Sequence, residues 1–121
     1  VYRSGKLMKE GRKKLNSLLA EFKNIKIRDK STIWNTEIIE AYELQNLLLQ
    51  SMASIDSALN RKESRGAHAR MDYQNRDDKK WMKHTMIAVN IEGKAKINYR
   101  SVNLKTNTKE IKTIEPKARV Y

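Results

Sequence analysis

Charged side chains of both signs gather in one stretch of the sequence, "RKESRGAHARMDYQNRDDKKW", which runs from Arg61 to Trp81. Guanidinium groups and carboxylates that alternate in this way suit bidentate ion pairs better than a phosphate-binding site. Gly66 permits a positive φ or a close approach of the backbone. The pattern predicts a docking loop, with a merely solvated loop as the alternative, because exposed ion pairs contribute little to stability. The alternating charged residues are Arg61, Lys62, Arg65, Arg70 and Arg76 with Glu63, Asp72, Asp77 and Asp78.

The sequence contains two histidines, His68 and His84, and no cysteine, which excludes disulfides and thiolate metal sites. Glu63, Asp72 and Arg65 are close enough in sequence to orient His68 as a general base. Neither a Ser-His-Asp set nor a glycine-rich phosphate loop accompanies it, however. We therefore favour a structural role, in which His68 makes a hydrogen bond that holds the loop. No catalytic, cofactor-binding or metal-ligating residue is predicted in this chain.

The chain has 121 residues, which fits one domain, and 26 basic against 14 acidic residues give a net charge of +12. Such a charge raises the possibility of nucleic-acid binding. The basic residues are scattered along the sequence, however, and form no stripe with interleaved aromatics and no helix-turn-helix pattern. A solvated basic surface is the better interpretation, and no nucleic-acid partner is predicted.

Two helices must position the charged stretch. Residues 4–25 place apolar side chains within about 120° of one face, which predicts an amphipathic helix. Packing against a second helix explains this face as well as binding to a membrane surface would. No apolar run reaches the length of a membrane span, so membrane insertion is not expected. The apolar face consists of Leu7, Gly11, Leu15, Leu18, Leu19, Phe22 and Ile25.

The second predicted helix covers residues 36–61, with Asn35 or Thr36 as its cap and Glu37 in its first turn. Its apolar side chains spread over about 220°, which is too wide for one partner helix. Either self-association or a segment missing from this sequence is expected to cover the remainder. The first residue is Val1 rather than methionine, which suggests a fragment of a longer protein.

The C-terminal third predicts a β-hairpin followed by an extended tail. The segments "WMKHTMIAVNI" and "KAKINY" are joined by Glu92, Gly93 and Lys94, and Thr85, Ile87, Val89 and Ile91 alternate along the first segment. An isolated hairpin is marginal, so it should pack on the helices or on another domain. The sequence thus predicts a mainly α protein with a helical bundle portion (1–61), a charged docking loop (62–81) and a hairpin with an extended tail (82–121).

One long segment, "WNTEIIEAYELQNLLLQSMASIDSALNRKESRGAHAR", resembles the C-terminal region of succinate dehydrogenase and fumarate reductase flavoprotein subunits. The alphaproteobacterial and mitochondrial succinate dehydrogenase type is the most similar. The resemblance extends through "VYRSGKLMKEGRKKL", "RDDKKWMKHTM", "KINYRSV" and "PKARVY", and so covers essentially the whole chain. There are two departures: Met71 stands where the family commonly has an acidic residue, and Gln74 where proline is frequent.

The resemblance implies a parent protein that carries FAD, oxidises succinate to fumarate and passes electrons through an iron-sulfur subunit toward quinone. The family's dinucleotide-binding motif, flavin-linked histidine and substrate-binding residues belong to preceding domains, so no position of this chain inherits a catalytic role. The whole chain would be one C-terminal domain fragment. Its family fold is an antiparallel three-helix bundle whose first helix would precede Val1. The expected location is the cytoplasmic face of the bacterial inner membrane, or the mitochondrial matrix side, attached peripherally through the complex.

The resemblance also gives the charged stretch a role, as a docking loop between the helical domain and the flavin-binding domain. Arg65 and Gly66 are predicted to make contacts across that boundary, with His68 and Arg70 as supports. The expected partners are the flavin-binding domain of the same subunit and the iron-sulfur subunit, and the isolated chain is expected to self-associate. The alternative is a free-standing basic helical module that binds nucleic acid or an acidic partner.

Overall fold

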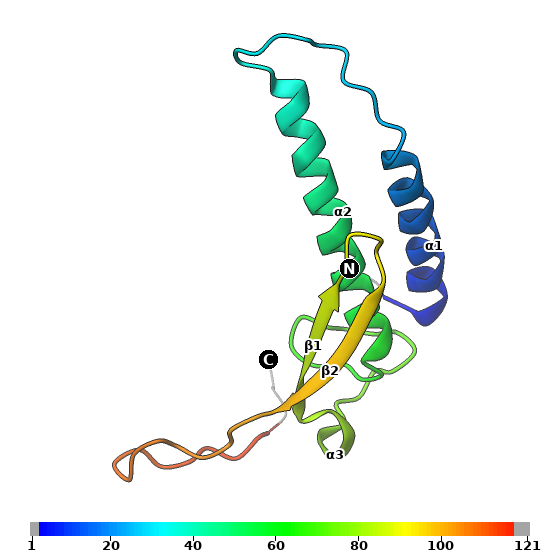
Figure 1. Ribbon diagram of the computed structural model, residues 1–121. Helices are drawn as coiled ribbons and strands as arrows, with labels where there is room; N and C mark the ends of the chain where they lie inside the picture. The colour runs from blue at the N-terminus through cyan, green and yellow to red at the C-terminus, as the bar shows by residue number, and fades with distance from the viewer. Residues whose placement is uncertain (1–2, 118–121) are drawn as a thin grey trace.

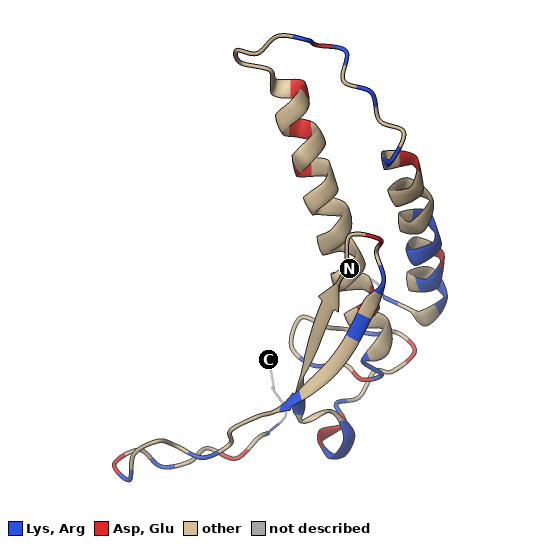
Figure 2. Ribbon diagram, viewed as in Figure 1, with Lys and Arg blue, Asp and Glu red and all other residues tan. Residues whose placement is uncertain are grey.

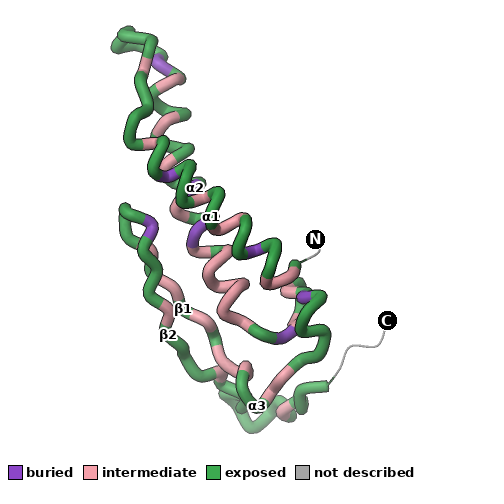
Figure 3. Tube along the Cα trace, turned by 90° about the vertical axis from the view of Figure 1, so that its right-hand side faces the viewer, coloured by how far each residue is buried: buried purple, intermediate pink, exposed green. Residues whose placement is uncertain are grey.

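The computed structural model describes residues 3–117, which form two long antiparallel helices with a β-hairpin against their side (Figure 1). The element order is α1 (Gly5–Phe22), α2 (Thr36–Asn60), α3 (Asp78–Trp81), β1 (Lys83–Val89) and β2 (Ala95–Ser101). The hairpin lies beside the half of the helical pair that contains the start of α1 and the end of α2 (Figures 1 and 3). The charged stretch 61–81 closes this same end of the molecule.

Helix α1 begins at a serine cap, because the hydroxyl of Ser4 accepts a hydrogen bond of 3.3 Å from the backbone N–H of Leu7. It ends at Phe22, so the predicted end at residue 25 was too late. The N–H groups of Asn24 and Ile25 bond the carbonyls three residues earlier, which turns the chain out of the helix.

The buried side of α1 is also rotated relative to the prediction. Met8 and Leu19 are buried, whereas Leu7 and Leu18 are 54% and 49% exposed. Of the predicted stripe, Leu15, Leu19 and Phe22 contribute to the core. The periodicity predicted an apolar face that is shifted by one residue from the observed buried face. It could not show which side of the apolar stripe packs against α2.

Helix α2 begins as predicted, with the side-chain oxygen of Asn35 accepting from the N–H of Ile38 at 3.1 Å. Leu48 and Met52 are buried between α2 and its neighbours. The apolar side chains of Ile39, Tyr42 and Leu47 remain 56%, 67% and 63% exposed. The wide apolar face predicted for this helix is therefore only partly covered by α1 and the hairpin.

The small core lies where α1, α2 and the hairpin meet. Leu19, Leu48 and Met52 form its centre, with Leu15, Phe22, Leu49 and Val89 packed around them. Gly93, at the hairpin turn, rests directly on this centre with φ at 75°. A Cβ atom there would lie 2.6 Å from Leu19 Cδ2 and 2.8 Å from Met52 Cε, so the turn approaches this closely only because it lacks a side chain.

Arg12 fixes the hairpin turn to both helices. From α1, its Nε donates to Asp56 of α2 at 2.7 Å, and its terminal nitrogen donates to the carbonyl of Gly93 at 3.0 Å. The hairpin thus leans on the helices, as its length predicted.

The two strands pair antiparallel in a register that runs from Lys83↔Ser101 to Val89↔Ala95. Thr85, Ile87 and Val89 are half-buried and alternate with exposed residues, as predicted, whereas Ile91 lies in the turn and is exposed. After β2 the described tail, up to residue 117, has no helix or strand. It runs out from the body and then doubles back (Figure 1), and Arg76 donates to the carbonyl of Lys117 at 2.9 Å. Residues 118–121 of the predicted tail lie outside the described residues.

Candidate functional site

The centre of the charged stretch is Glu63, whose side chain is completely buried. Its carboxylate accepts hydrogen bonds from Arg61 at 2.6 Å, from two nitrogens of Arg65 at 2.9 and 3.0 Å, and from the backbone N–H of Asp77 at 2.9 Å. A buried carboxylate is costly unless it is paired and its remaining lone pairs are satisfied. Glu63 meets both conditions.

The hydrogen bonds to Glu63 decide its charge state. Burial alone would raise the pKa of Glu63, but the hydrogen bonds from Arg65, Asp77 and Arg61 outweigh burial and lower the pKa to about 2. Contact with Glu63 in turn raises the pKa of Arg65. The pair is therefore ionised at neutral pH.

Arg65 bridges Glu63 to the start of α3. The terminal nitrogen that donates to Glu63 also reaches Asp78 at 2.5 Å, and Arg76 binds the other oxygen of Asp78 at 2.9 Å. The bidentate partner of Arg65 is thus Glu63 of the same stretch, whereas the sequence placed that partner beyond a domain boundary. The prediction of a continuous loop over 62–81 also missed α3, whose four residues are too few to show a period and which Asp77 caps.

Gly66 lies at the tip of a tight turn closed by paired hydrogen bonds between Arg65 and His68, of 2.8 and 3.0 Å. Its φ is 57°, and no atom lies within 4 Å of the place that a Cβ would take. Of the two roles that the sequence allowed for this glycine, the structure shows the positive φ.

His68 has both ring nitrogens engaged. Nδ1 lies 3.0 Å from a terminal nitrogen of Arg3, and Nε2 lies 3.1 Å from the carbonyl oxygen of Arg61. Arg3 can only donate and the carbonyl can only accept, so the neutral ring with its proton on Nε2 fits both contacts. Burial, followed by the positive charges of Arg3, Arg70 and Arg61, lowers the pKa of His68. The predicted structural hydrogen bond is present, and it joins the loop to the end of α2.

Arg70 is 4% exposed and links the ends of the two long helices. One of its terminal nitrogens donates to the carbonyls of Ala58, Leu59 and Arg61 at 3.1–3.2 Å, where α2 ends. Its other nitrogens hold Asp72 in a bidentate pair at 2.8 and 2.6 Å. A cation at a helix C-terminus also opposes the negative end of the helix dipole.

Asp72 completes this link at the start of α1. Its second oxygen accepts from the backbone N–H of Gly5 at 2.9 Å, so a carboxylate lies at the positive end of α1. The bidentate contact with Arg70, assisted by this N–H, holds the pKa of Asp72 well below its usual range. We call Arg70 and Asp72 together the helix clasp.

Sequence reasoning did not identify the two carboxylates that organise the site. It counted Glu63 and Asp72 among the alternating charges and as possible partners of His68, but it assigned neither to a particular arginine, although Glu63 stands two residues from both Arg61 and Arg65. That spacing was the available signal. Within residues 3–117 no group of three His, Asp or Glu side chains could hold a metal ion. The arrangement can brace the backbone, and it leaves Gly66, Ala67, Ala69 and Met71 exposed at its rim.

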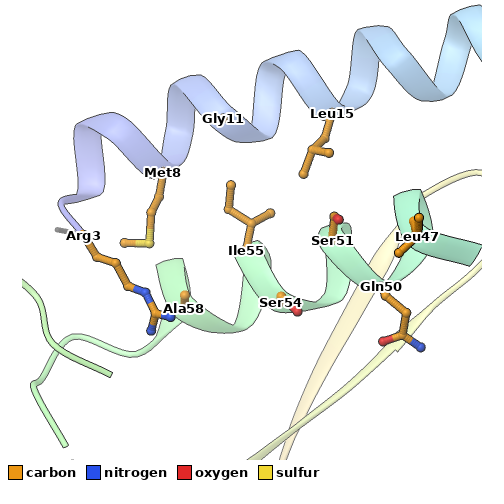
Figure 4. A pocket seen from close by; sticks show the side chains of 10 residues that line it. All are labelled: Arg3, Met8, Gly11, Leu15, Leu47, Gln50, Ser51, Ser54, Ile55 and Ala58. Atoms are coloured by element: carbon orange, nitrogen blue, oxygen red, sulfur yellow. The ribbon is translucent and has the colours of Figure 1, made fainter. Parts of the chain in front are cut away.

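A groove of about 520 Å³ runs between α1 and α2 on the side away from the hairpin (Figure 4). Gly11 of α1 and Ser51, Ser54 and Ala58 of α2 give it small side chains along its floor. The full lining is Arg3, Met8, Gly11, Leu15, Leu47, Gln50, Ser51, Ser54, Ile55 and Ala58. The apolar face of α2 was predicted to be too wide for one partner helix, and this groove is the part of that face that α1 and the hairpin leave uncovered.

Charge and hydropathy place further limits on the surface. Figure 2 shows the basic residues spread over α1, the connection that follows it, the charged stretch and the tail, rather than gathered in one patch. None of the helices described within residues 3–117 is at once long enough and apolar enough to cross a bilayer.

Comparisons with known proteins give a consistent result. The family model described as "Fumarate reductase flavoprotein C-term" matches residues 1–121. The chain is 46% identical to the succinate dehydrogenase flavoprotein subunit of Rickettsia bellii, over all of this chain and 20% of that protein. It is 43% identical to the mitochondrial succinate dehydrogenase [ubiquinone] flavoprotein subunit of Oryza sativa, over all of this chain and 19% of that protein.

A solved structure shares the fold. The FrdA chain of an E. coli quinol fumarate reductase variant superimposes with a TM-score of 0.84 at 35% identity, covering 89% of this chain and 19% of that chain. The chain thus spans about a fifth of the length of the relatives it matches. These matches contradict the alternative of a free-standing basic module and confirm the resemblance.

Proposed function

Since this chain belongs to the fumarate reductase flavoprotein C-terminal family, we propose that it serves as the non-catalytic C-terminal domain of a succinate dehydrogenase flavoprotein subunit. The parent protein would bind FAD, oxidise succinate to fumarate and pass the electrons to an iron-sulfur subunit and then to quinone. The observation that carries the proposal is the match of all 121 residues, the charged stretch included, at 46% identity.

Within the parent, the charged stretch would dock the helical pair on the flavin-binding domain. Arg65, His68 and Arg70 would support the docking surface and would not contact the flavin-binding domain, because their polar atoms are already bound to this chain. The turn at Gly66 would make the contact itself, since its backbone is exposed and no side chain covers it. A stretch braced by buried ion pairs is preorganised for docking, so little entropy is lost when it binds.

The groove between α1 and α2 would receive a third helix that precedes Val1 in the parent and completes the bundle. The small side chains of Gly11, Ser51, Ser54 and Ala58 would let its backbone come close. Leu47, now 63% exposed, would be buried by the same helix. The assembled subunit would sit peripherally on the cytoplasmic face of a bacterial inner membrane, or on the matrix side in a mitochondrion.

The proposal is tested first on the isolated chain, which should neither retain flavin nor react with succinate. The chain is incubated with FAD, desalted and scanned through the flavin absorbance bands, and a dye-reduction assay is run with succinate. Retained flavin or succinate-dependent reduction would contradict a non-catalytic role. A coding region that continues several hundred residues upstream of Val1 is expected, and one that starts at Val1 would contradict the parent protein.

The docking role is tested in the full-length parent. Arg65→Ala should lower flavin content or assembly, because it leaves buried Glu63 short of two hydrogen bonds. Arg65→Lys should recover only part of the loss, since an ammonium group cannot reproduce the planar fork. Lys109→Ala in the exposed tail is the matched control. Normal flavin content and turnover in Arg65→Ala would show that the stretch is a solvated loop without a docking role.

A further inference from the structure

His68 joins two parts of the chain, and only one of its two ring contacts depends on its protonation state. The contact of Nε2 with the carbonyl oxygen of Arg61, at 3.1 Å, needs a proton on Nε2, which the neutral tautomer described above and the cation both carry. The contact of Nδ1 with a terminal nitrogen of Arg3, at 3.0 Å, needs a lone pair on Nδ1, which the cation lacks. Protonation of the ring therefore removes the contact with Arg3 and keeps the contact with Arg61.

The surroundings of the ring are positively charged. It faces Arg3 from the segment before α1, Arg61 from the end of α2 and Arg70 from the charged stretch. A proton on Nδ1 would place the imidazolium in direct contact with the guanidinium of Arg3, and like charges at this distance repel. Repulsion therefore adds to the loss of the hydrogen bond.

Arg3 connects the charged stretch to the segment that leads into α1. Its side chain donates to His68, and its carbonyl oxygen accepts from the backbone N–H of Met71 at 2.8 Å. A parallel backbone bridge between Arg3 and Arg70 accompanies these two bonds. Of these contacts only the one with His68 changes when a proton is added, and the N–H of Met71 reports whether the segment stays attached.

Arg3 also lines the groove between α1 and α2, at the end that Ala58 marks (Figure 4). The stem of its side chain contributes to the wall of the groove while its terminal nitrogen is held by His68. Loss of the contact with His68 would free this side chain to move. The protonation state of one histidine is thus linked both to the charged stretch and to one end of the groove.

We propose that His68 is a pH-sensitive latch: its neutral ring holds the segment that leads into α1 against the charged stretch through Arg3, and proton uptake on Nδ1 releases that segment. The ring is half-buried, so a proton from solvent can reach it. The inference goes beyond the proposed function and does not rest on it, because every group of the latch belongs to this chain. We call Arg3 and His68 the latch pair.

The latch pair responds in a pH range that the carboxylates of the site do not share. Burial and the three arginines lower the pKa of His68 below 6.5, so the neutral ring is fully populated above pH 6.5, and its stabilisation is lost as the pH falls through the pKa of the folded state. Glu63 and Asp72 stay ionised in this range, because hydrogen bonds from arginine lower the pKa of both. The other histidine, His84, is exposed on β1 and serves as a control.

The test is backbone hydrogen exchange in the full-length parent, measured by mass spectrometry at about pH 7.5 and about pH 5, which spans the range of histidine. Each exchange rate is divided by the intrinsic rate at the same pH. The N–H of Met71 should lose about tenfold in protection at the lower pH, which corresponds to the loss of one hydrogen bond to a charged group. The amides of β1 (Lys83–Val89) report global unfolding and should keep their protection.

Two variants hold the latch pair in its two states. His68→Asn keeps an acceptor oxygen near the place of Nδ1 but has no basic group, so the protection of the Met71 N–H should be equal at the two pH values. Arg3→Met keeps an unbranched side chain in the groove but cannot donate, so this protection should already be about tenfold lower at the higher pH, without a further loss at the lower pH. His84→Asn should behave like the unaltered protein.

Three results would overturn the latch. The first is an unaltered protein in which the Met71 N–H is equally protected at both pH values. The second is a loss of protection at low pH that is as large in His68→Asn, which would assign the effect to another group. The third is an Arg3→Met variant that keeps full protection. Flavin content is measured on the same samples, and a parent protein that holds no FAD would contradict the proposed function alone.

Discussion

At the level of single residues, the site is organised by two charged groups that are removed from water. Glu63 is buried among Arg61, Arg65 and the N–H of Asp77, and Arg70 is buried among three carbonyls and Asp72. Removing one partner of such a group leaves an uncompensated charge, which costs far more than breaking an exposed ion pair. Substitutions at these positions should therefore affect stability strongly.

The stability of the chain should depend on pH through Glu63. Its pKa is lowered from 4.5 to about 2 on folding, so the stabilisation is complete above pH 4.5 and is lost as the pH falls toward 2. The shift corresponds to about 3 kcal/mol. Urea unfolding between pH 2 and 6 measures it. Glu63→Gln should flatten this part of the curve and lower stability at pH 7, whereas Glu43→Gln, at an exposed position of α2, should leave both unchanged.

The helix clasp predicts a second contrast. Arg70→Ala should lower the free energy of unfolding by about 3 kcal/mol, because it leaves helix carbonyls and Asp72 without a donor. Arg70→Lys should restore part of this. Arg76→Ala removes a more exposed ion pair and should cost less than about 1 kcal/mol. Equal costs at Arg70 and Arg76, measured by urea unfolding, would show that burial does not strengthen the clasp.

The sequence predicted the chemistry of these residues better than their connections. Alternating charges correctly indicated bidentate arginine–carboxylate pairs, and Gly66 correctly indicated a positive φ. The sequence could not show that Asp72 would cap α1, because the two are 67 residues apart in the chain. Contacts of that kind depend on which helix ends meet, which is a property of the tertiary fold.

At the level of elements, the hairpin turn and the two long helices are fitted to one another at Gly93. Both Gly93 and Gly66 have a positive φ, but Gly93 lies against Leu19 and Met52 while Gly66 faces open space. The two glycines therefore allow backbone strain and packing to be separated by the same substitution.

Gly66→Ala should cost about 1 kcal/mol, which is the penalty of a left-handed backbone for alanine. Gly93→Ala should cost about 2 to 4 kcal/mol, because overpacking of the core is added to that penalty. Thermal or urea unfolding of the two variants gives the comparison. A Gly93 variant no less stable than the Gly66 variant would mean that the hairpin turn is free to lift from the helices.

The elements themselves were largely predictable. The hydrophobic periodicity and the capping residues predicted both long helices and the hairpin. The predicted helix ends differ from the observed ends by at most three residues. The errors have local causes: two i to i+3 bonds end α1 early, and α3 is too short to show a period. The side of α1 that faces the core could not be fixed from its sequence, since Leu7 and Met8 are equally apolar neighbours and only packing selects between them.

At the level of the whole molecule, the chain exposes more apolar side chains than its own core can use. Ile39, Tyr42 and Leu47 of α2 remain largely in water, and Leu47 lines the groove. Each such side chain forgoes about 1.5 to 3 kcal/mol of burial. In the parent protein this surface would be covered, and in isolation it is available to another copy.

We therefore expect the isolated chain to self-associate with increasing concentration. Light scattering should show a mass above that of the monomer, and Leu47→Lys should return it to the monomer by placing a charge in the contact. Ile114→Lys, in the exposed tail, is the control and should change nothing. A monomer at all concentrations that also fails to bind the dye ANS would show that the apolar face is too small to drive association.

The helix clasp has a consequence for kinetics as well as for stability. It joins residues 5 and 72, so it can form only after both long helices have aligned and the chain between them has been closed into a loop. We expect an interaction completed that late to be absent from the folding transition state, and an interaction absent from that state slows unfolding without speeding folding. The clasp should therefore lower the rate constant of unfolding, so that the folded helical pair has a longer lifetime before it opens.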